Sequence, residues 1–299
     1  MKTIKGKIEE RSLFVKICLF LLLMVLTTLL ALGVWMAIFN GDQSLVSLKV
    51  MQMLQTVGTF LLPCLAGAYL WSKRPMHWLQ MDKGIGWKES VICIVLIVCA
   101  SPGINLLAWL NGMIELPSFL SHLEELMKQQ EESAALLTER FIRADNAGTL
   151  LLNVVLIALL PAISEEVCFR GTLQTLFSSG NRNRYVAVWA SAVLFSAIHF
   201  QFYGFVPRML LGALFGYMLL WSGSLWLPIL AHFTNNCMSV LLYNFFYMQG
   251  KNVDEIDAFG TEGTVWAGIV SLLLSGVMIY LLRHSLTIKR ASSRISAGN

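Results

Sequence analysis

Four short stretches carry polar or charged side chains inside long apolar runs. They are "PAISEEVCFRG" at 161–171, "FSAIH" at 195–199, "PRM" at 207–209 and "PILAHFTNN" at 228–236. Charged groups are costly in an apolar setting and by default mark functional positions. Carboxylate, imidazole and amide groups together suit hydrolysis, which needs a base to deprotonate water and donors to stabilise an oxyanion.

The first stretch contains two adjacent carboxylates and one guanidinium. Glu166 and Arg170 are spaced i,i+4 with the acid first, which favours an ion pair on one helix. Glu165 points to a different face of that helix and has no such local partner. We expect Arg170 to neutralise Glu166 and Glu165 to act as a base. The alternative is a buried ion cluster that only holds helices together.

The second stretch places His199 at the far end of the next apolar segment. Glu165 lies 17 positions before Arg182 in a short polar loop, and His199 lies 17 positions after it. In an antiparallel helix pair with a constant rise per residue, equal offsets give equal depth. We therefore expect Glu165 and His199 to face each other, although a lone histidine can also be a satisfied core residue.

The last stretch pairs His232 with Asn236 on one helical face, where both can donate hydrogen bonds to an oxyanion. Asn235 points elsewhere and is expected to hydrogen-bond between packed helices. His232 follows the turn at 222–224 by only a few residues. This gives it a shallower depth in the membrane than the hairpin predicts for Glu165 and His199. Either the hairpin 147–203 projects out of the bilayer or the helix that carries His232 starts deeper.

Two prolines and one arginine complete the polar set. Pro161 would release the carbonyl of Ile157 and bend its helix, whereas Pro228 suits the first turn of a helix. Bends of this kind can open a wet cavity in a bilayer. Arg208 is near a span end, so we expect its side chain to snorkel toward the membrane surface.

These residues must be positioned by membrane helices. The 299 residues are 56% hydrophobic and 13% charged, against roughly 45–50% and about 25% in soluble domains. The expected fold is all-α, a polytopic membrane helix bundle of about eight transmembrane helices, with an uncleaved first span. The expected spans are 13–39, 50–71, 90–111, 147–178, 185–203, 207–222, 225–247 and 264–283.

The basic residues predict the orientation of these spans. With eight spans, 15 lysines and arginines fall on the side of both termini and six on the other side. By the positive-inside rule, both termini are expected on the cytoplasmic side of the membrane. The membrane is expected to be the cell membrane of a bacterium. The net charge of +4 gives no support for a nucleic-acid partner, so the expected partners are the lipid bilayer and a peptide or protein substrate.

The chain divides into three predicted segments of one bundle. Residues 1–146 hold three spans and an acidic outer segment at 114–146, expected to form an amphipathic surface helix; a lid over a substrate is the alternative. Residues 147–247 hold the polar stretches, and 248–299 hold the last span and a basic tail. The six cysteines lack a paired spacing and are interpreted as free core thiols.

The polar stretches resemble the motifs of a known family. "EEVCFRG" resembles the EExxxR motif, "FSAIH" the FxxxH motif with Phe195 and His199, and "HFTNN" the HxxxN motif of the CAAX protease and bacteriocin-processing (CPBP, or Abi) family, which includes Rce1-type prenyl endopeptidases. "SGSLWLPILAHFTNN" also looks like bacterial members. The resemblance covers roughly 147–245, with three ordered motifs on separate spans.

The resemblance implies an intramembrane endopeptidase. Glu165 with His199 would activate water, His232 and Asn236 would stabilise the oxyanion, and Glu166, Arg170 and Phe195 would support the site. The family has also been described as metalloproteases, which implies zinc held by Glu165, His199 and His232. A metallopeptidase HExxH helix is absent from the sequence, so we expect a glutamate mechanism with no cofactor.

Two other function classes remain as alternatives. A transporter or channel would use Glu165, Arg170 and His199 as an ion relay. A non-catalytic scaffold or immunity protein would bind a partner through the same fold.

Overall fold

A computed structural model describes residues 4–179, 182–251 and 254–297. Over these ranges the chain is helical and contains no strand, which confirms the all-α prediction. The elements are α1 (Leu13–Phe39), α2 (Leu45–Gln55), η1 (Thr56–Leu61), α3 (Leu62–Trp71), α4 (Pro75–Trp78), α5 (Trp87–Gly112), η2 (Ser118–Leu120), α6 (Ser121–Ile142), α7 (Ala147–Asn153), η3 (Val154–Leu159), α8 (Leu160–Glu166), η4 (Val167–Gln174), α9 (Thr175–Phe177), α10 (Arg184–Ala197), α11 (Phe205–Ser222), α12 (Trp226–Met248), α13 (Asp254–Ala258) and α14 (Val265–Ala297).

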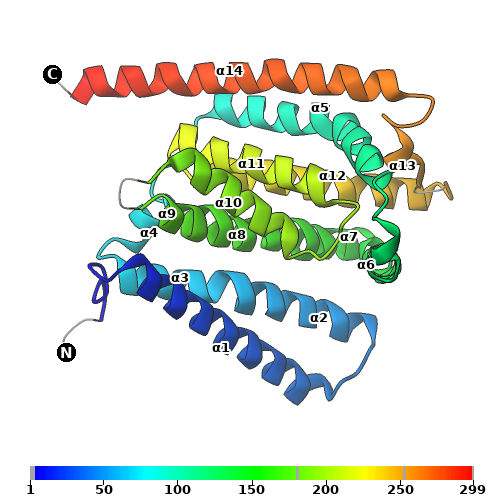
Figure 1. The fold of residues 1–299 in the computed structure, drawn as a ribbon, viewed down its shortest axis with the longest axis horizontal. Helices are drawn as coiled ribbons and strands as arrows, with labels where there is room; N and C mark the ends of the chain where they lie inside the picture. Colours follow the sequence, from blue (N-terminus) through cyan, green and yellow to red (C-terminus); the bar gives the residue numbers. More distant parts are fainter. Residues whose placement is uncertain (1–3, 180–181, 252–253, 298–299) are drawn as a thin grey trace.

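Most long helices run along one direction and form three layers (Figure 1). One outer layer contains α1 packed on α2 and α3, and the other contains α5 packed along α14. Between them lie the helices of residues 147–248. The middle layer is therefore covered on both sides, while the division at 146 and 247 stays a prediction.

A helix lies at every one of the eight expected spans. Six stretches among the described residues are long and apolar enough to cross a membrane: Leu13–Phe39, Leu45–Trp71, Trp87–Gly112, Ala147–Phe177, Phe205–Ser222 and Val265–Ile288. By the length and apolar composition of these helices, the chain is an integral membrane protein. Of the other two, α10 has 14 residues and α12 has 23. The predicted helix at 185–203 is wrong beyond residue 197, and α14 runs past its predicted end at 283.

Local signals set several helix ends. The side chains of Ser44, Asn146 and Asn183 accept backbone hydrogen bonds at the starts of α2, α7 and α10. Asn40 and Gly223 adopt the left-handed conformation that ends α1 and α11. The start of α1 and the end of α14 lie at the same end of the bundle, as an even number of crossings requires (Figure 1).

The amphipathic segment expected at 114–146 is confirmed as a helix. Its main element, α6, lies across the bundle at the end opposite the termini (Figure 1). It is joined to the middle layer by a 3.1 Å hydrogen bond from the Tyr203 N–H to the Glu131 carboxylate. Lys49, expected in a loop on this side, instead lies within α2 and is buried, donating to the Asn153 side chain at 2.7 Å.

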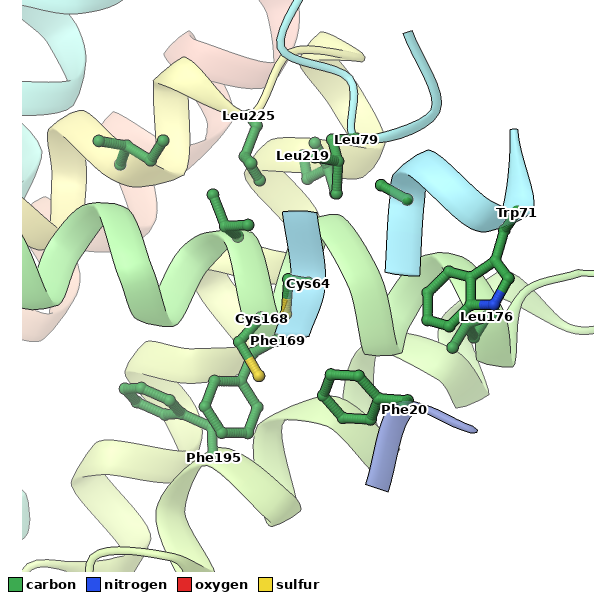
Figure 2. Packing of buried hydrophobic residues seen from close by; sticks show 13 residues of the cluster. Phe20, Cys64, Trp71, Leu79, Cys168, Phe169, Leu176, Phe195, Leu219 and Leu225 are labelled. Carbon is green, nitrogen blue, oxygen red and sulfur yellow. The ribbon is translucent and has the colours of Figure 1, made fainter. Parts of the chain in front are cut away.

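All six cysteines are free, as predicted. Cys64, Cys93 and Cys168 are buried, but Cys18 is exposed on α1, so a core position was wrong for that residue. Figure 2 shows Cys64 and Cys168 close together within a core cluster that joins α3 to η4. Among the basic residues used for orientation, Lys2 lies outside the described residues, as do the side chains of Lys289, Arg290 and Arg294.

Candidate active site

A cavity of about 430 Å³ opens within the middle layer and collects the polar residues singled out from the sequence. Pro161 and Glu165 of α8 line one wall. Its other walls include residues from the end of α10, the start of α11 and the middle of α12. The predicted residues that line it are Glu165, Phe195, His199, His232 and Asn236. The structure therefore brings four separate elements to one cavity.

The predicted ion pair between Glu166 and Arg170 is confirmed. Arg170 Nη1 donates to Glu166 Oε1 at 2.7 Å, and both side chains are fully buried. Arg170 Nη2 also donates to the Gly212 carbonyl at 2.9 Å, and the guanidinium lies 4.4 Å from the ring centre of Phe195. The pair therefore links η4 to α11 and α10 beneath the cavity.

The same carboxylate orients His232. The distance from His232 Nδ1 to Glu166 Oε1 is 2.9 Å, and a carboxylate accepts, so Nδ1 is the donor. This leaves His232 Nε2 facing Glu165, with 3.9 Å between Nε2 and Glu165 Oε2. That separation is too long for a direct hydrogen bond. The ring is stacked on Phe215 at 5.3 Å between centroids, which fixes its plane.

His199 reaches the cavity from the turn that follows α10 rather than from a helix. Its Nδ1 donates to the Phe195 carbonyl at 2.7 Å, and its ring stands edge-on to Phe195 at 5.2 Å. In the neutral ring, Nε2 is then the atom with a free lone pair. Glu165 and His199 do line the same cavity, but the ion-pair contact that the structure gives Glu165 is to His232.

Two residues have a different position from the one expected. Asn235, expected to pack between helices, lines the cavity and donates from Nδ2 to Asn236 Oδ1 at 3.2 Å. Because that oxygen is engaged, the Nδ2 group of Asn236 is the one left to donate into the cavity. Arg208, expected to snorkel to the surface, also lines the cavity. It is half-buried in the first turn of α11 and donates to the Gln201 side chain.

His232 and the carboxylates meet because the α11–α12 turn lies beside the helix that carries Glu166, while the depth of either helix in a bilayer stays a prediction. A Cβ on Gly171 would lie 3.2 Å from both Leu225 and Leu79, so these leucines pack directly on the helix that carries Glu166 (Figure 2). The backbone N–H of Leu225 donates to the Gln80 carbonyl at 2.8 Å. The α11–α12 turn is therefore level with Gly171, and His232 reaches the carboxylates within two turns.

The helix that carries the carboxylates is irregular on both sides of them. A π-helix, η3, comes immediately before Leu160 and Pro161, and another, η4, begins directly after Glu166. Proline lacks the N–H that a regular helix would use, and a wide turn accommodates this. The predicted disturbance at Pro161 is therefore a π-helical turn, whereas Pro228 lies in the first turn of α12 as predicted.

The residues that the zinc alternative names, Glu165, His199 and His232, all line the cavity. In the parts of the chain that are described, no three His, Cys, Asp or Glu side chains are grouped closely enough to hold a metal ion. His232 Nδ1 donates to Glu166, which leaves Nε2 as the ring nitrogen that faces the cavity. The choice between a glutamate mechanism and a metal-dependent one stays a prediction.

Comparison with known proteins agrees with the motifs. Residues 147–238 match the family model described as type II CAAX prenyl endopeptidase Rce1-like. This part of the chain is similar to that family and is called the Rce1-like segment below. The match covers α7 to the first half of α12, and so includes every predicted site residue. The first three spans and α14 lie outside the Rce1-like segment.

A curated relative is similar to about a third of the chain. The chain is 28% identical over 107 residues to "Uncharacterized protein YpbD" of Bacillus subtilis (strain 168), covering 34% of this chain and 52% of that protein. The match therefore spans about half the length of that relative. No solved structure matches.

Three contributors within the Rce1-like segment were missed from sequence: Phe215, Gly212 and Gly216. Gly212 accepts from Arg170, and Gly216 accepts from Gln174 at 3.1 Å. Glycines four residues apart on an apolar helix are a known signal of close helix contact. That spacing on α11 could have identified its face toward η4, but nothing in the sequence marks Phe215.

Proposed function

We propose that this protein is an intramembrane endopeptidase that hydrolyses a peptide bond of a membrane-associated protein or peptide. The observation that carries the proposal is the 3.9 Å approach of Glu165 and His232 Nε2 in a cavity shared with His199 and Asn236. The Rce1-like match supports the same reaction class. Substrate identity is not part of the proposal beyond its association with the membrane.

The proposed mechanism uses Glu165 as the base. Its carboxylate takes a proton from water while the oxygen attacks the scissile carbonyl carbon, and His199 Nε2 helps to position that water. The carbonyl oxygen becomes an oxyanion that the Asn236 amide and a protonated His232 stabilise. The intermediate collapses when the C–N bond breaks and Glu165 returns its proton to the leaving amine. No metal takes part in this scheme.

Glu166 and Arg170 act through His232 in this proposal. The Glu166 carboxylate accepts from His232 Nδ1 and so holds the ring with Nε2 directed at the position of the oxyanion. Arg170 in turn holds Glu166 in place through a fully buried ion pair. Both are positioning residues, since neither lines the cavity.

Purified protein in detergent, incubated with a membrane-anchored peptide library with and without a chelator, tests the function. We expect Glu165→Gln, His199→Ala and His232→Ala each to lower turnover about 10²- to 10⁴-fold while the protein stays folded. Glu132→Gln, on exposed α6, is the matched control. Full turnover by Glu165→Gln would contradict the proposal, and loss of activity with chelator would contradict its metal-free form.

The same protein distinguishes the rival classes. A transporter would keep uptake in Asn236→Ala, and a scaffold would keep its biological effect in Glu165→Gln. We also propose that both termini lie in the cytoplasm, on the basis of the lysine and arginine asymmetry. Labelling of single cysteines placed near residue 5 and in the 200–204 loop, in intact and opened cells, tests this orientation.

A further inference from the structure

Arg208 is a cation inside the cavity that the proposed mechanism does not use. It lies in the first turn of α11 and lines the cavity together with Glu165 and His232. Its Nη2 donates to Gln201 Oε1 at 2.7 Å. Its Nη1 is fully enclosed and has no hydrogen-bond partner. A guanidinium offers five donors, so most of its capacity is unused.

No carboxylate of the described chain lies within ion-pair distance of this arginine, and Glu131 and Glu165 act on it only from longer range. Ion pairs within 4.0 Å involve Arg143 and Arg170 among the described arginines, and not Arg208. Glu131, on the neighbouring α6, instead accepts the backbone N–H of Tyr203. A charge without a direct ion-pair partner inside a membrane protein is costly and is kept where it serves a function. Arg208 therefore holds a positive charge available to a ligand.

The surrounding backbone keeps that charge directed into the cavity. Gly204, at the start of α11, also lines the cavity, and a Cβ there would lie 3.1 Å from Arg208 Nη2. The absence of a side chain leaves room for the guanidinium to fold back toward the chamber. The amino end of the 18-residue helix α11 adds a partial positive charge at the same place.

We propose that Arg208 binds a carboxylate of the substrate and so sets both specificity and orientation. This inference rests on the proposed function. Arginine pairs with carboxylates through two parallel hydrogen bonds, which fixes direction as well as position. Glu165 repels an anion, so the substrate carboxylate lies at the α11 end and the scissile carbonyl lies near Glu165 and His232. The carboxylate is either the carboxy terminus of the peptide or an Asp or Glu side chain.

The test compares wild type with Arg208→Gln and Arg208→Lys on one randomised peptide library. The library is used with free and with amidated carboxy termini, each with and without Asp and Glu. We expect wild type to prefer one kind of carboxylate, and that kind identifies its source. Arg208→Gln should lower kcat/KM for carboxylate peptides about 10- to 100-fold, mainly through KM, and leave carboxylate-free peptides unchanged. Arg208→Lys should retain part of the preference for carboxylate peptides. Arg143→Gln, a substitution outside the cavity, should retain all of it.

Equal kcat loss on both kinds of peptide in Arg208→Gln would overturn the inference, because it would place Arg208 at the oxyanion. An absence of carboxylate preference in wild type would overturn it as well. Binding of the same labelled peptides to Glu165→Gln needs no turnover, so it separates this inference from the proposed hydrolysis. If Arg208→Gln does not fold, Arg208→Lys, which keeps the charge but not the paired donors, must show a selective loss of affinity for carboxylate peptides or the inference fails.

Discussion

Replacement of Arg170 by methionine tests the claim that one ion pair organises the candidate site. The mutation removes the guanidinium from the Glu166 carboxylate in a position that is fully buried. Removal of one partner from a buried pair destabilises proteins by about 3–5 kcal/mol, out of a usual total of about 5–15 kcal/mol. We expect the free energy of unfolding to fall by that amount. Turnover should also be lost, because Glu166 is no longer held in place to orient His232.

A double-mutant cycle makes this prediction quantitative. Glu166→Gln with Arg170→Met removes both charges and keeps an oxygen that can accept from His232 Nδ1. The double variant should be more stable than the sum of the single losses predicts, with a coupling energy of about 2–3 kcal/mol. Stability is measured by thermal and denaturant unfolding in one detergent, followed by tryptophan fluorescence.

An exposed pair with the same i,i+4 spacing is the control. Arg143 pairs with Glu139 on α6, where the two side chains are 51% and 38% exposed. Arg143→Met should cost about 0–1 kcal/mol, as exposed pairs do. If Arg170→Met is no more destabilising than Arg143→Met, or if the two charges at the site show no coupling, the reasoning about the buried pair is refuted.

Three further outcomes are expected. Asn236→Ala should lower kcat about 10²- to 10³-fold, and Asn235→Ala less, because Asn235 only orients the Asn236 amide; steady-state kinetics on a cleaved peptide checks both. Gly212→Ala should reduce thermal stability and turnover, since its Cβ would lie 3.0 Å from Arg170 Nη2, whereas equal stability would show that the helices adjust freely. A hydrogen bond from a lysine holds the pKa of Glu124 below its usual value. The ionised Glu124 therefore stabilises α6 near neutral pH, and this stabilisation is lost as the pH falls through the lowered pKa. Amide exchange of α6 should become faster in acid in the wild type, and this acid effect should be absent in Glu124→Gln.

The sequence predicted the helices and the polar residues that meet, because both follow from local pattern. Apolar runs of bilayer length predict helices, and the i,i+4 spacing of Glu166 and Arg170 predicts their contact without tertiary information. The equal offsets of Glu165 and His199 from the loop predicted that these two residues face each other, and both do line one cavity. They could not predict which histidine approaches Glu165, because that depends on how α12 packs.

The errors concern packing between distant segments. The position of α12 is set by Leu79 and Leu225, which contact Gly171 from different parts of the chain. The environments of Arg208 and Asn235 were predicted from their positions along single helices. The walls of a cavity are formed by several helices, so a single helix does not show which residues line it. The end of α10 at Ala197 was missed because the apolar composition continues after the helix stops.

The shortness of α10 has a consequence for the surrounding lipid. Its 14 residues span about 21 Å, whereas the hydrocarbon layer is about 30 Å thick. Tyr185, Val186, Val193 and Leu194 on this helix are exposed on the outside of the bundle. The bilayer must therefore thin against this wall, or headgroups and water must descend to meet the loop that carries His199. A peptide that unwinds beside α10 would leave hydrocarbon sooner there than where α1 or α14 borders the membrane.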